Sequence, residues 1–166
     1  MHIVYIGIGT NLEPRLRRMS DAYAAIERLG VVEMRSSMYE TAPQGYTEQP
    51  NFLNSVVMLG TKLPLETLHG ELKKIEIDLG RKKRSRWHER EIDFDILFFD
   101  DEIVVSDDLT VPHSEIKNRS FVLVPLNEIA AEFVHPVLRK SISELLDELT
   151  YEENSISRCS EATLKT

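Results

Sequence analysis

Apolar residues follow two different periods along the chain, and segments with the two periods alternate. A period of two, rich in β-branched residues, predicts strands over residues 3–8, 31–40, 51–59 and 92–99. A helical period predicts helices over residues 14–29 and 64–80, each stopped by a glycine. The resulting order, β-α-β-β-α-β, is the split βαβ or ferredoxin-like pattern.

The pattern weakens after the last of these strands. Residues 103–105 predict a short strand, and residues 121–131 predict a helix in part. We expect that helix to break near Pro125, because proline lacks the N–H that a helix interior needs.

The last part of the chain holds one clear helix signal. Ser141 and Glu144 have the spacing of a capping box, which predicts a helix running to about Leu149. From Glu152 the residues are polar and without period, which predicts a frayed tail. We therefore expect a single catalytic domain over residues 1–151 and a partly disordered tail over residues 152–166. The expected fold is α+β, with a ferredoxin-like core, a mostly antiparallel sheet and helices packed as an α/β/α sandwich.

Composition narrows the class of protein. The chain has 166 residues, 42% of them hydrophobic and 29% charged, as in an ordinary soluble domain with one core. A net charge of −8 argues against a general nucleic-acid binder. The single cysteine, Cys159, excludes an internal disulfide and a cysteine-based metal cage. Residues 1–6 lack the pattern of a signal peptide and no apolar run reaches about 20 residues, so we expect a cytoplasmic protein without membrane partners. We also expect a monomer.

The charges are unevenly distributed. Residues 81–90 hold six basic residues and one acidic residue, whereas the rest of the chain holds 14 basic and 27 acidic residues. A local cationic segment in an anionic protein suggests a local anionic ligand, such as a phosphorylated small molecule. The alternative is a solvated surface loop.

Two acids follow this segment within the last predicted strand. Strand side chains alternate, so Asp93 and Asp95 share one face while Phe94 points to the other. Aspartate is disfavoured in strands, and two like charges so close repel each other. Divalent cations offset that repulsion, because paired carboxylates hold Mg²⁺ ions that also bind phosphate oxygens. The alternative is a solvent-facing strand surface on which acids are tolerated.

Arginines and aromatic residues complete the list of candidates. Arg86 and Arg90 precede the acids at the mouth of the same strand, the arrangement that phosphoryl transfer needs. Phe52 and Asn54 lie on the third strand or its approach, and we expect them on opposite faces. The glycine-containing turn over residues 7–12 is not a dinucleotide fingerprint, and no P-loop is present.

These residues resemble one enzyme family. Residues 86–97 read R-W-H-E-R-E-I-D-F-D-I-L, similar to the R-W-x-x-R-x-x-D-x-D-I signature of 6-hydroxymethyl-7,8-dihydropterin pyrophosphokinases. Supporting motifs lie in order at residues 5–11, 39–43, 52–54 and 109–121, and the resemblance covers most of the chain. His88 and Glu89 depart from the family, which has a small residue and a proline there.

The resemblance implies an ATP-dependent pyrophosphokinase of folate biosynthesis, which transfers pyrophosphate from ATP to the pterin hydroxymethyl group and releases AMP. It implies that Asp93 and Asp95 hold two Mg²⁺ ions. It implies catalytic roles for Arg81, Lys83, Arg90, Asp93 and Asp95. Implied contacts to ATP are Glu76, Arg86, Trp87, Ile96, Thr110, His113 and Arg119. Implied contacts to the pterin are Thr41, Ala42, Gln44, Phe52, Asn54 and Phe121, with the ring between the two phenylalanines. The loops at 42–51 and 81–90 would act as lids.

Two other classes of protein share part of this pattern. A metal-dependent phosphohydrolase or nucleotidyltransferase also uses an Asp-x-Asp pair with arginines, but needs no aromatic clamp of pterin size. A non-catalytic ferredoxin-like ligand-binding module needs no acid pair on a strand.

Overall fold

The core of the protein is an antiparallel sheet. The computed structural model describes residues 1–82 and 88–160. The sheet has the strand order β5-β1-β4-β3-β8, and β2 pairs with β4 beside β3. The bounds of these strands are β1 His2–Thr10, β2 Val31–Arg35, β3 Tyr39–Thr41, β4 Phe52–Thr61, β5 Asp93–Phe99 and β8 Ile156–Arg158. The predicted split βαβ core and α+β class are confirmed, since β5, β1, β4 and β2 stand in the ferredoxin-like order.

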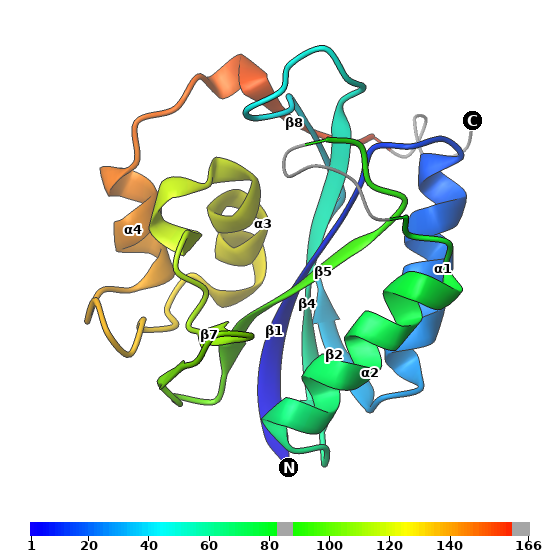
Figure 1. Ribbon diagram of the computed structural model, residues 1–166. Helices are drawn as coiled ribbons and strands as arrows, with labels where there is room; N and C mark the ends of the chain where they lie inside the picture. The colour runs from blue at the N-terminus through cyan, green and yellow to red at the C-terminus, as the bar shows by residue number, and fades with distance from the viewer. Residues whose placement is uncertain (83–87, 161–166) are drawn as a thin grey trace.

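Helices cover both faces of the sheet, as Figure 1 shows, and make three layers. On one face lie α1 (Arg15–Glu27) and α2 (Leu65–Asp78), and on the other lie α3 (Ser120–Ala130) and α4 (Ile142–Glu148). Each interface holds its own apolar cluster. The first contains Ile6, Ile26 and Leu72, and the second contains Leu97 and Leu126. The α/β/α sandwich predicted from the sequence is therefore present.

Two predicted elements differ in detail. The strand expected over residues 31–40 is divided into β2 and β3. At the division, the Val56 N–H donates to the Ser36 hydroxyl at 2.9 Å, where a regular strand pair would offer a backbone carbonyl. The helix α3 is not broken at Pro125. The apolar residues of α3 are buried in the second cluster, and this packing offsets the hydrogen bond that proline removes.

The remaining short elements follow β5. They are β6 (Val104–Val105), β7 (Thr110–Val111) and the 3₁₀ turns η1 (Ile116–Asn118) and η2 (Glu153–Ser155). The capping box predicted at the start of α4 is confirmed, with Ser141 and Glu144 bonded reciprocally. The frayed tail expected from Glu152 is wrong for residues 156–158, which form β8. The last residues of the expected tail, 161–166, lie outside the described residues. No helix within residues 1–82 and 88–160 is long and apolar enough to cross a bilayer.

Candidate active site

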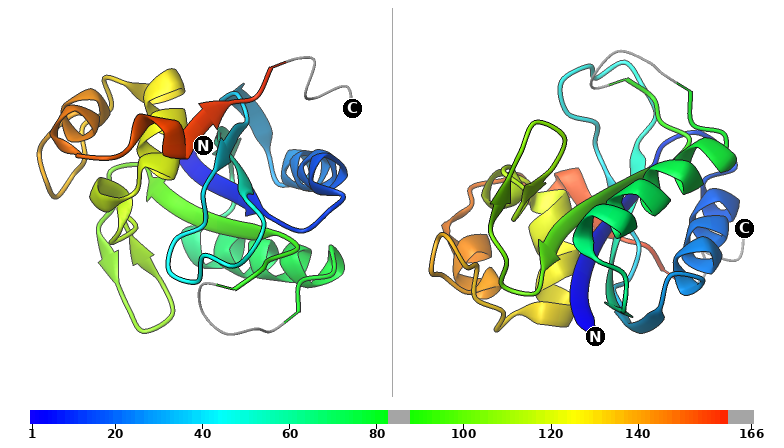
Figure 2. Two further views of the ribbon diagram at one scale, coloured as in Figure 1. Left: turned by 90° about the horizontal axis from the view of Figure 1, so that it is seen from above. Right: turned by 60° about the horizontal axis from the view of Figure 1, so that its bottom comes forward.

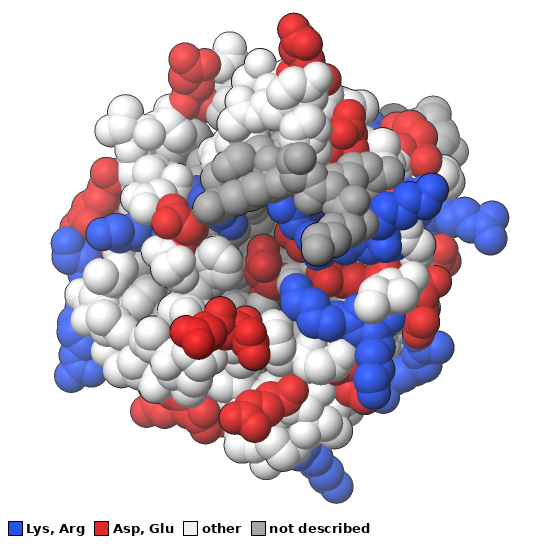
Figure 3. Space-filling model, viewed as in Figure 1, with Lys and Arg blue, Asp and Glu red and all other residues white. Residues whose placement is uncertain are grey.

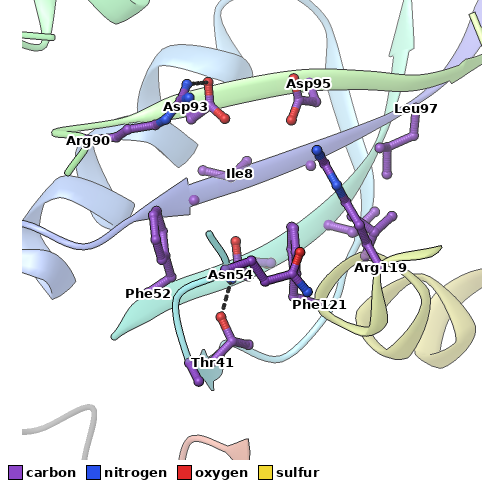
Figure 4. Close-up of a pocket in the computed structure, with 17 residues that line it drawn as sticks. Ile8, Thr41, Phe52, Asn54, Arg90, Asp93, Asp95, Leu97, Arg119 and Phe121 are labelled. Carbon is purple, nitrogen blue, oxygen red and sulfur yellow. Dashed lines mark hydrogen bonds and ion pairs between the residues drawn. The ribbon is translucent and has the colours of Figure 1, made fainter. Parts of the chain in front are cut away.

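The two predicted metal ligands stand on the face of β5 that is turned away from α1 and α2. Asp93 lies opposite Gly9 of β1, and Asp95 lies opposite Gly7. Between them, Phe94 is buried in the first apolar cluster. Both carboxylates line one pocket together with these glycines (Figure 4). The alternation predicted from the sequence is confirmed, and the bare glycine backbone leaves room in front of the acids.

Asp93 is held by two arginines. Its Oδ1 atom accepts hydrogen bonds from Arg81 Nη1 at 2.9 Å and from Arg90 Nη1 at 3.3 Å. Figure 4 shows the guanidinium of Arg90 turned toward this carboxylate at the mouth of β5. Burial opposes protonation of Arg81, but the neighbouring charges of Asp93 and Glu76 outweigh it and raise the pKa of Arg81. Arg81 and Arg90 therefore both lie beside Asp93, whereas Arg86, the other arginine expected at the mouth of the strand, lies outside the described residues.

Glu76 supports this arrangement from α2. Its side chain is 3% exposed. It accepts a hydrogen bond at 2.8 Å from the Phe94 N–H, a donor on the open edge of β5. The same carboxylate lies 2.9 Å from Arg81 Nη1 and 3.4 Å from Lys73 Nζ. Desolvation raises the pKa of Glu76, and these cations oppose the rise. Glu76 thus satisfies an edge-strand donor and orients Arg81.

The surroundings of Asp95 disfavour its charged form. Desolvation, with the charge of Asp93 second, raises the pKa of Asp95 to about 7. His113 Nε2 is 3.9 Å from Asp95 Oδ1. Burial and then the charge of Arg119 lower the pKa of His113. Its Nδ1 accepts the Glu115 N–H at 3.2 Å, which leaves the hydrogen on Nε2, toward Asp95.

The other half of the pocket is aromatic. Phe52 and Phe121 stand on either side of Asn54 in Figure 4. Asn54 donates from Nδ2 to Thr41 Oγ1 at 2.7 Å, and both side chains are buried. The expectation that Phe52 and Asn54 face opposite ways is wrong, since residues two apart on a strand share a face. The pocket therefore joins a charged wall to a flat apolar slot with a polar edge.

Ten of the predicted site residues line this single pocket. They are Thr41, Ala42, Gln44, Phe52, Asn54, Arg90, Asp93, Asp95, Arg119 and Phe121. Of the other described candidates, Glu76, Arg81 and His113 contact the acids or stand next to them. Thr110 lies half-buried on β7, and Ile96 packs in the first apolar cluster. Lys83, Arg86 and Trp87 lie outside the described residues.

Sequence reasoning missed several pocket residues. They are Gly7, Ile8, Gly9, Ser55, Val56, Leu97 and Val122. A signal existed for Leu97, because it follows Asp93 and Asp95 at the same spacing of two and so shares their face. For β1 and β4 no such signal existed before their pairing was known.

Asn11 joins the two loops that flank the pocket. It is fully buried at the end of β1, and its Oδ1 accepts the Arg90 N–H at 2.8 Å. Its Nδ2 donates to Gln49 Oε1 at 2.9 Å and to the Pro50 carbonyl at 3.0 Å. The rings of Tyr46 and His88, one from each loop, stack on each other with their centroids 4.4 Å apart and their planes 10° from parallel. His88, a departure from the family signature, thus connects the same two loops.

The donor set at the acid pair suits a hard divalent cation. Among residues 1–82 and 88–160, no group of three or more His, Cys, Asp or Glu residues forms a metal cage. Mg²⁺ does not need one, because it commonly binds through one or two carboxylates plus substrate phosphates and water. Figure 3 shows Lys and Arg side chains interspersed with Asp and Glu side chains on the side of the molecule where α2 lies.

Comparison with known proteins points to one family. The family model described as 7,8-dihydro-6-hydroxymethylpterin-pyrophosphokinase matches residues 5–131. A 2-amino-4-hydroxy-6-hydroxymethyldihydropteridine pyrophosphokinase of Aquifex aeolicus is 38% identical over 90% of this chain and 94% of its own length. The enzyme of the same name from Haemophilus influenzae is 39% identical over 82% of this chain and 86% of its own length.

A solved structure supports the fold. The Plasmodium falciparum HPPK-DHPS protein, crystallised with SDX-DHP, superposes with a TM-score of 0.71 at 19% identity. The match covers 89% of this chain, which spans 43% of that longer chain. At this identity the likeness concerns the arrangement of helices and strands.

Proposed function

The chain belongs to the 7,8-dihydro-6-hydroxymethylpterin-pyrophosphokinase family and is a pyrophosphokinase of folate biosynthesis, and from this premise we propose how it acts on its substrates. It transfers the terminal two phosphates of ATP to 6-hydroxymethyl-7,8-dihydropterin and releases AMP. The observation that carries this proposal is the combination, in one pocket, of an arginine-flanked acid pair and a slot between two phenylalanines.

The transfer is a substitution at the β-phosphorus of ATP. The hydroxymethyl oxygen of the pterin forms the new bond to that phosphorus, and its proton is released. The bond between the β-phosphorus and the oxygen that bridges to the α-phosphorus breaks. AMP leaves with the bridging oxygen, and the pterin carries the diphosphate. Such a reaction is accelerated mainly by positioning and by stabilisation of charge.

The aromatic half of the pocket binds the pterin. A flat heterocycle stacks well in an offset manner on phenylalanine rings, which Phe52 and Phe121 supply. The Asn54–Thr41 pair offers both donors and acceptors to the edge of the ring. Ala42 and Gln44, at the start of the loop after β3, close this side. The hydroxymethyl group then points along β1 toward the acids of β5.

The charged half binds the triphosphate. Asp93 and Asp95 would hold two Mg²⁺ ions, which neutralise phosphate charge when bound. Arg90 and Arg81, which both donate to Asp93, are close enough to the acids to donate to phosphate oxygens as well. Glu76 keeps Arg81 oriented. Arg119 lines the same pocket, and His113 Nε2 lies 3.9 Å from Asp95 Oδ1. Contacts of Ile96, Thr110, Lys83, Arg86 and Trp87 with ATP remain part of the proposal.

Phosphorus NMR tests this function. The chain is mixed with ATP, Mg²⁺ and 6-hydroxymethyl-7,8-dihydropterin, and we expect AMP and a pterin diphosphate in equal amounts. Release of inorganic phosphate without a pterin product would indicate a hydrolase, and an unchanged spectrum would indicate a binding module. Either result would contradict the proposal.

A further inference from the structure

The chain returns to the sheet after α4 and adds a strand beside the pterin side of the pocket. Residues 152–159, which we name the C-terminal strap, contain η2 and β8. β8 pairs antiparallel with β3, with Tyr39 opposite Arg158, Glu40 opposite Ser157 and Thr41 opposite Ile156. Figure 2 shows this segment passing α3 to reach the sheet. The matching family model ends at residue 131, so the strap lies beyond it.

Further backbone bonds extend this pairing at both ends. The Ala42 N–H donates to the Ser155 carbonyl at 3.0 Å, and the Cys159 N–H donates to the Met38 carbonyl at 2.9 Å. The strap therefore follows residues 38–42 along their whole length. Two of these residues, Thr41 and Ala42, line the pocket, whereas no described residue of the strap does.

β3 is too short to be held firmly by pairing with one neighbouring strand alone. It has three residues, and on its inner side it pairs only with β4, over Asn54 to Phe52. A strand of this length at a sheet edge opens locally at low free energy. With β8 on its outer side, β3 becomes an interior strand, and Thr41 is kept where its Oγ1 accepts the Asn54 amide at 2.7 Å.

The strap also meets the helix that carries the other wall of the slot. Glu128 of α3 accepts hydrogen bonds from the Ser37 hydroxyl at 2.7 Å and from the Tyr39 hydroxyl at 2.8 Å. Arg158 of β8 lies 3.8 Å from the same carboxylate. Phe121 stands at the start of α3. The strand that carries Thr41, at the polar edge of the slot, and the helix that carries Phe121 are thus connected to each other, and the strap contacts both.

We propose that the C-terminal strap is a positioning element for the pterin half of the active site, a role that rests on the proposed function. It holds the backbone of residues 38–42 so that Thr41 and Ala42 present a preformed edge to the pterin. Its contacts are with this half and not with the acids of β5. Loss of the pairing therefore weakens binding of the pterin and leaves binding of ATP nearly unchanged.

One exposed position tests the strap with a matched control. Ser157 lies in the middle of β8, and its side chain is exposed, so Ser157→Ala removes only a hydroxyl. Ser157→Pro removes the backbone N–H and disrupts pairing with β3. For Ser157→Pro we expect the KM for the pterin to rise about tenfold, equivalent to ~1.4 kcal/mol, with the KM for ATP changed less than about twofold. Ser157→Ala should match the unsubstituted chain in both constants.

Truncation gives a second variant. A chain ending at Tyr151 lacks the strap, and a chain ending at Ser160 keeps all of its described contacts. We expect the first to show the same rise in pterin KM and the second to show none. An unchanged pterin KM in Ser157→Pro, or an equal rise in both KM values, would overturn the proposal.

Hydrogen exchange separates this inference from the proposed function. In Ser157→Pro, the amides of residues 39–42 should exchange faster than in Ser157→Ala, while those of β5 keep their protection. This readout needs no substrate. If the unsubstituted chain makes no AMP, the proposed function fails. If exchange at residues 39–42 is the same in both variants, the strap proposal fails.

Discussion

Arg81 Nη1 lies 2.9 Å from Asp93 Oδ1 and also 2.9 Å from Glu76 Oε1. One guanidinium therefore connects a buried acid of α2 to a pocket acid of β5. The buried acid in turn accepts the Phe94 N–H of the same strand. Helix α2 and the edge strand β5, with the face that carries Asp93, are in this way held by a single cluster, whose parts can be tested separately.

Replacing the carboxylate of Glu76 by an amide should destabilise the fold. For Glu76→Gln we expect the free energy of unfolding to fall by about 2 kcal/mol, because an amide has one acceptor oxygen, so either the Phe94 N–H or the guanidinium of Arg81 then faces an NH₂ group. Urea unfolding followed by circular dichroism measures this. Glu71→Gln is the control on the same helix. Its carboxylate makes a solvent-accessible pair with Lys74 at 3.3 Å, and the expected change is under about 0.5 kcal/mol. Equal effects in the two variants would refute the structural role of Glu76.

Removing Asp95 should abolish the reaction without harming the fold. For Asp95→Ala we expect AMP formation to fall by at least roughly 10²-fold, since a ligand for the triphosphate–metal complex is lost. Stability should be maintained or increased, because repulsion between Asp95 and Asp93 and the desolvation of Asp95 disappear. Asp101→Ala, in the exposed turn after β5, is the control. Near-normal turnover of purified Asp95→Ala would contradict the assignment.

Alanine substitutions at Gly9 and Gly7 are a matched pair that tests the contact of Asn54 with the edge of the pterin. A Cβ added at Gly9 would meet Asn54 Oδ1 at 2.7 Å, so Gly9→Ala must displace the amide that bonds to Thr41. A Cβ at Gly7 would meet Leu97 at an ordinary contact distance of 3.7 Å. We expect steady-state kinetics to show a pterin KM at least about fivefold higher in Gly9→Ala than in Gly7→Ala. The reverse order would count against Asn54 as a reader of the pterin edge.

Glu128 gives a prediction for pH. Burial disfavours the charged form of Glu128, but hydrogen bonds from Ser37 and Tyr39 outweigh burial and lower the pKa of Glu128 below its ordinary 4.5. A lowered folded-state pKa adds stability that is complete above the ordinary value and is lost as the pH falls through the folded value.

Glu128→Gln should therefore be less stable than the unsubstituted chain by about 1–2 kcal/mol near neutral pH, with the difference shrinking as the pH falls below the ordinary pKa of 4.5. Denaturant unfolding at several pH values measures this, with Glu132→Gln, exposed just beyond α3, as the control. A difference that does not depend on pH would show that the carboxylate charge is not responsible.

The sequence was informative where a residue's role follows from its neighbours in the chain. Ser141 and Glu144 predicted their own cap, and the period of two in β5 predicted which face carries Asp93 and Asp95. Glu76 also had an unused signal, since its spacing from Leu72 places it on the buried face of α2.

β8 could not be predicted in this way. It is a three-residue polar segment whose strand geometry comes from pairing with β3, more than 100 residues earlier, and not from any period of its own. The slot between Phe52 and Phe121 likewise depends on contacts between distant elements. The family resemblance, and not periodicity, brought those two residues together before the fold was known.

The most direct test of the proposed reaction follows the phosphorus atoms of ATP. ATP labelled at the β-phosphorus and ATP labelled at the α-phosphorus are each incubated with the chain, Mg²⁺ and 6-hydroxymethyl-7,8-dihydropterin, and the products are separated. Transfer of pyrophosphate predicts that the β label moves to the pterin product and that the α label remains in AMP. Recovery of the β label in ADP or in inorganic phosphate would contradict it.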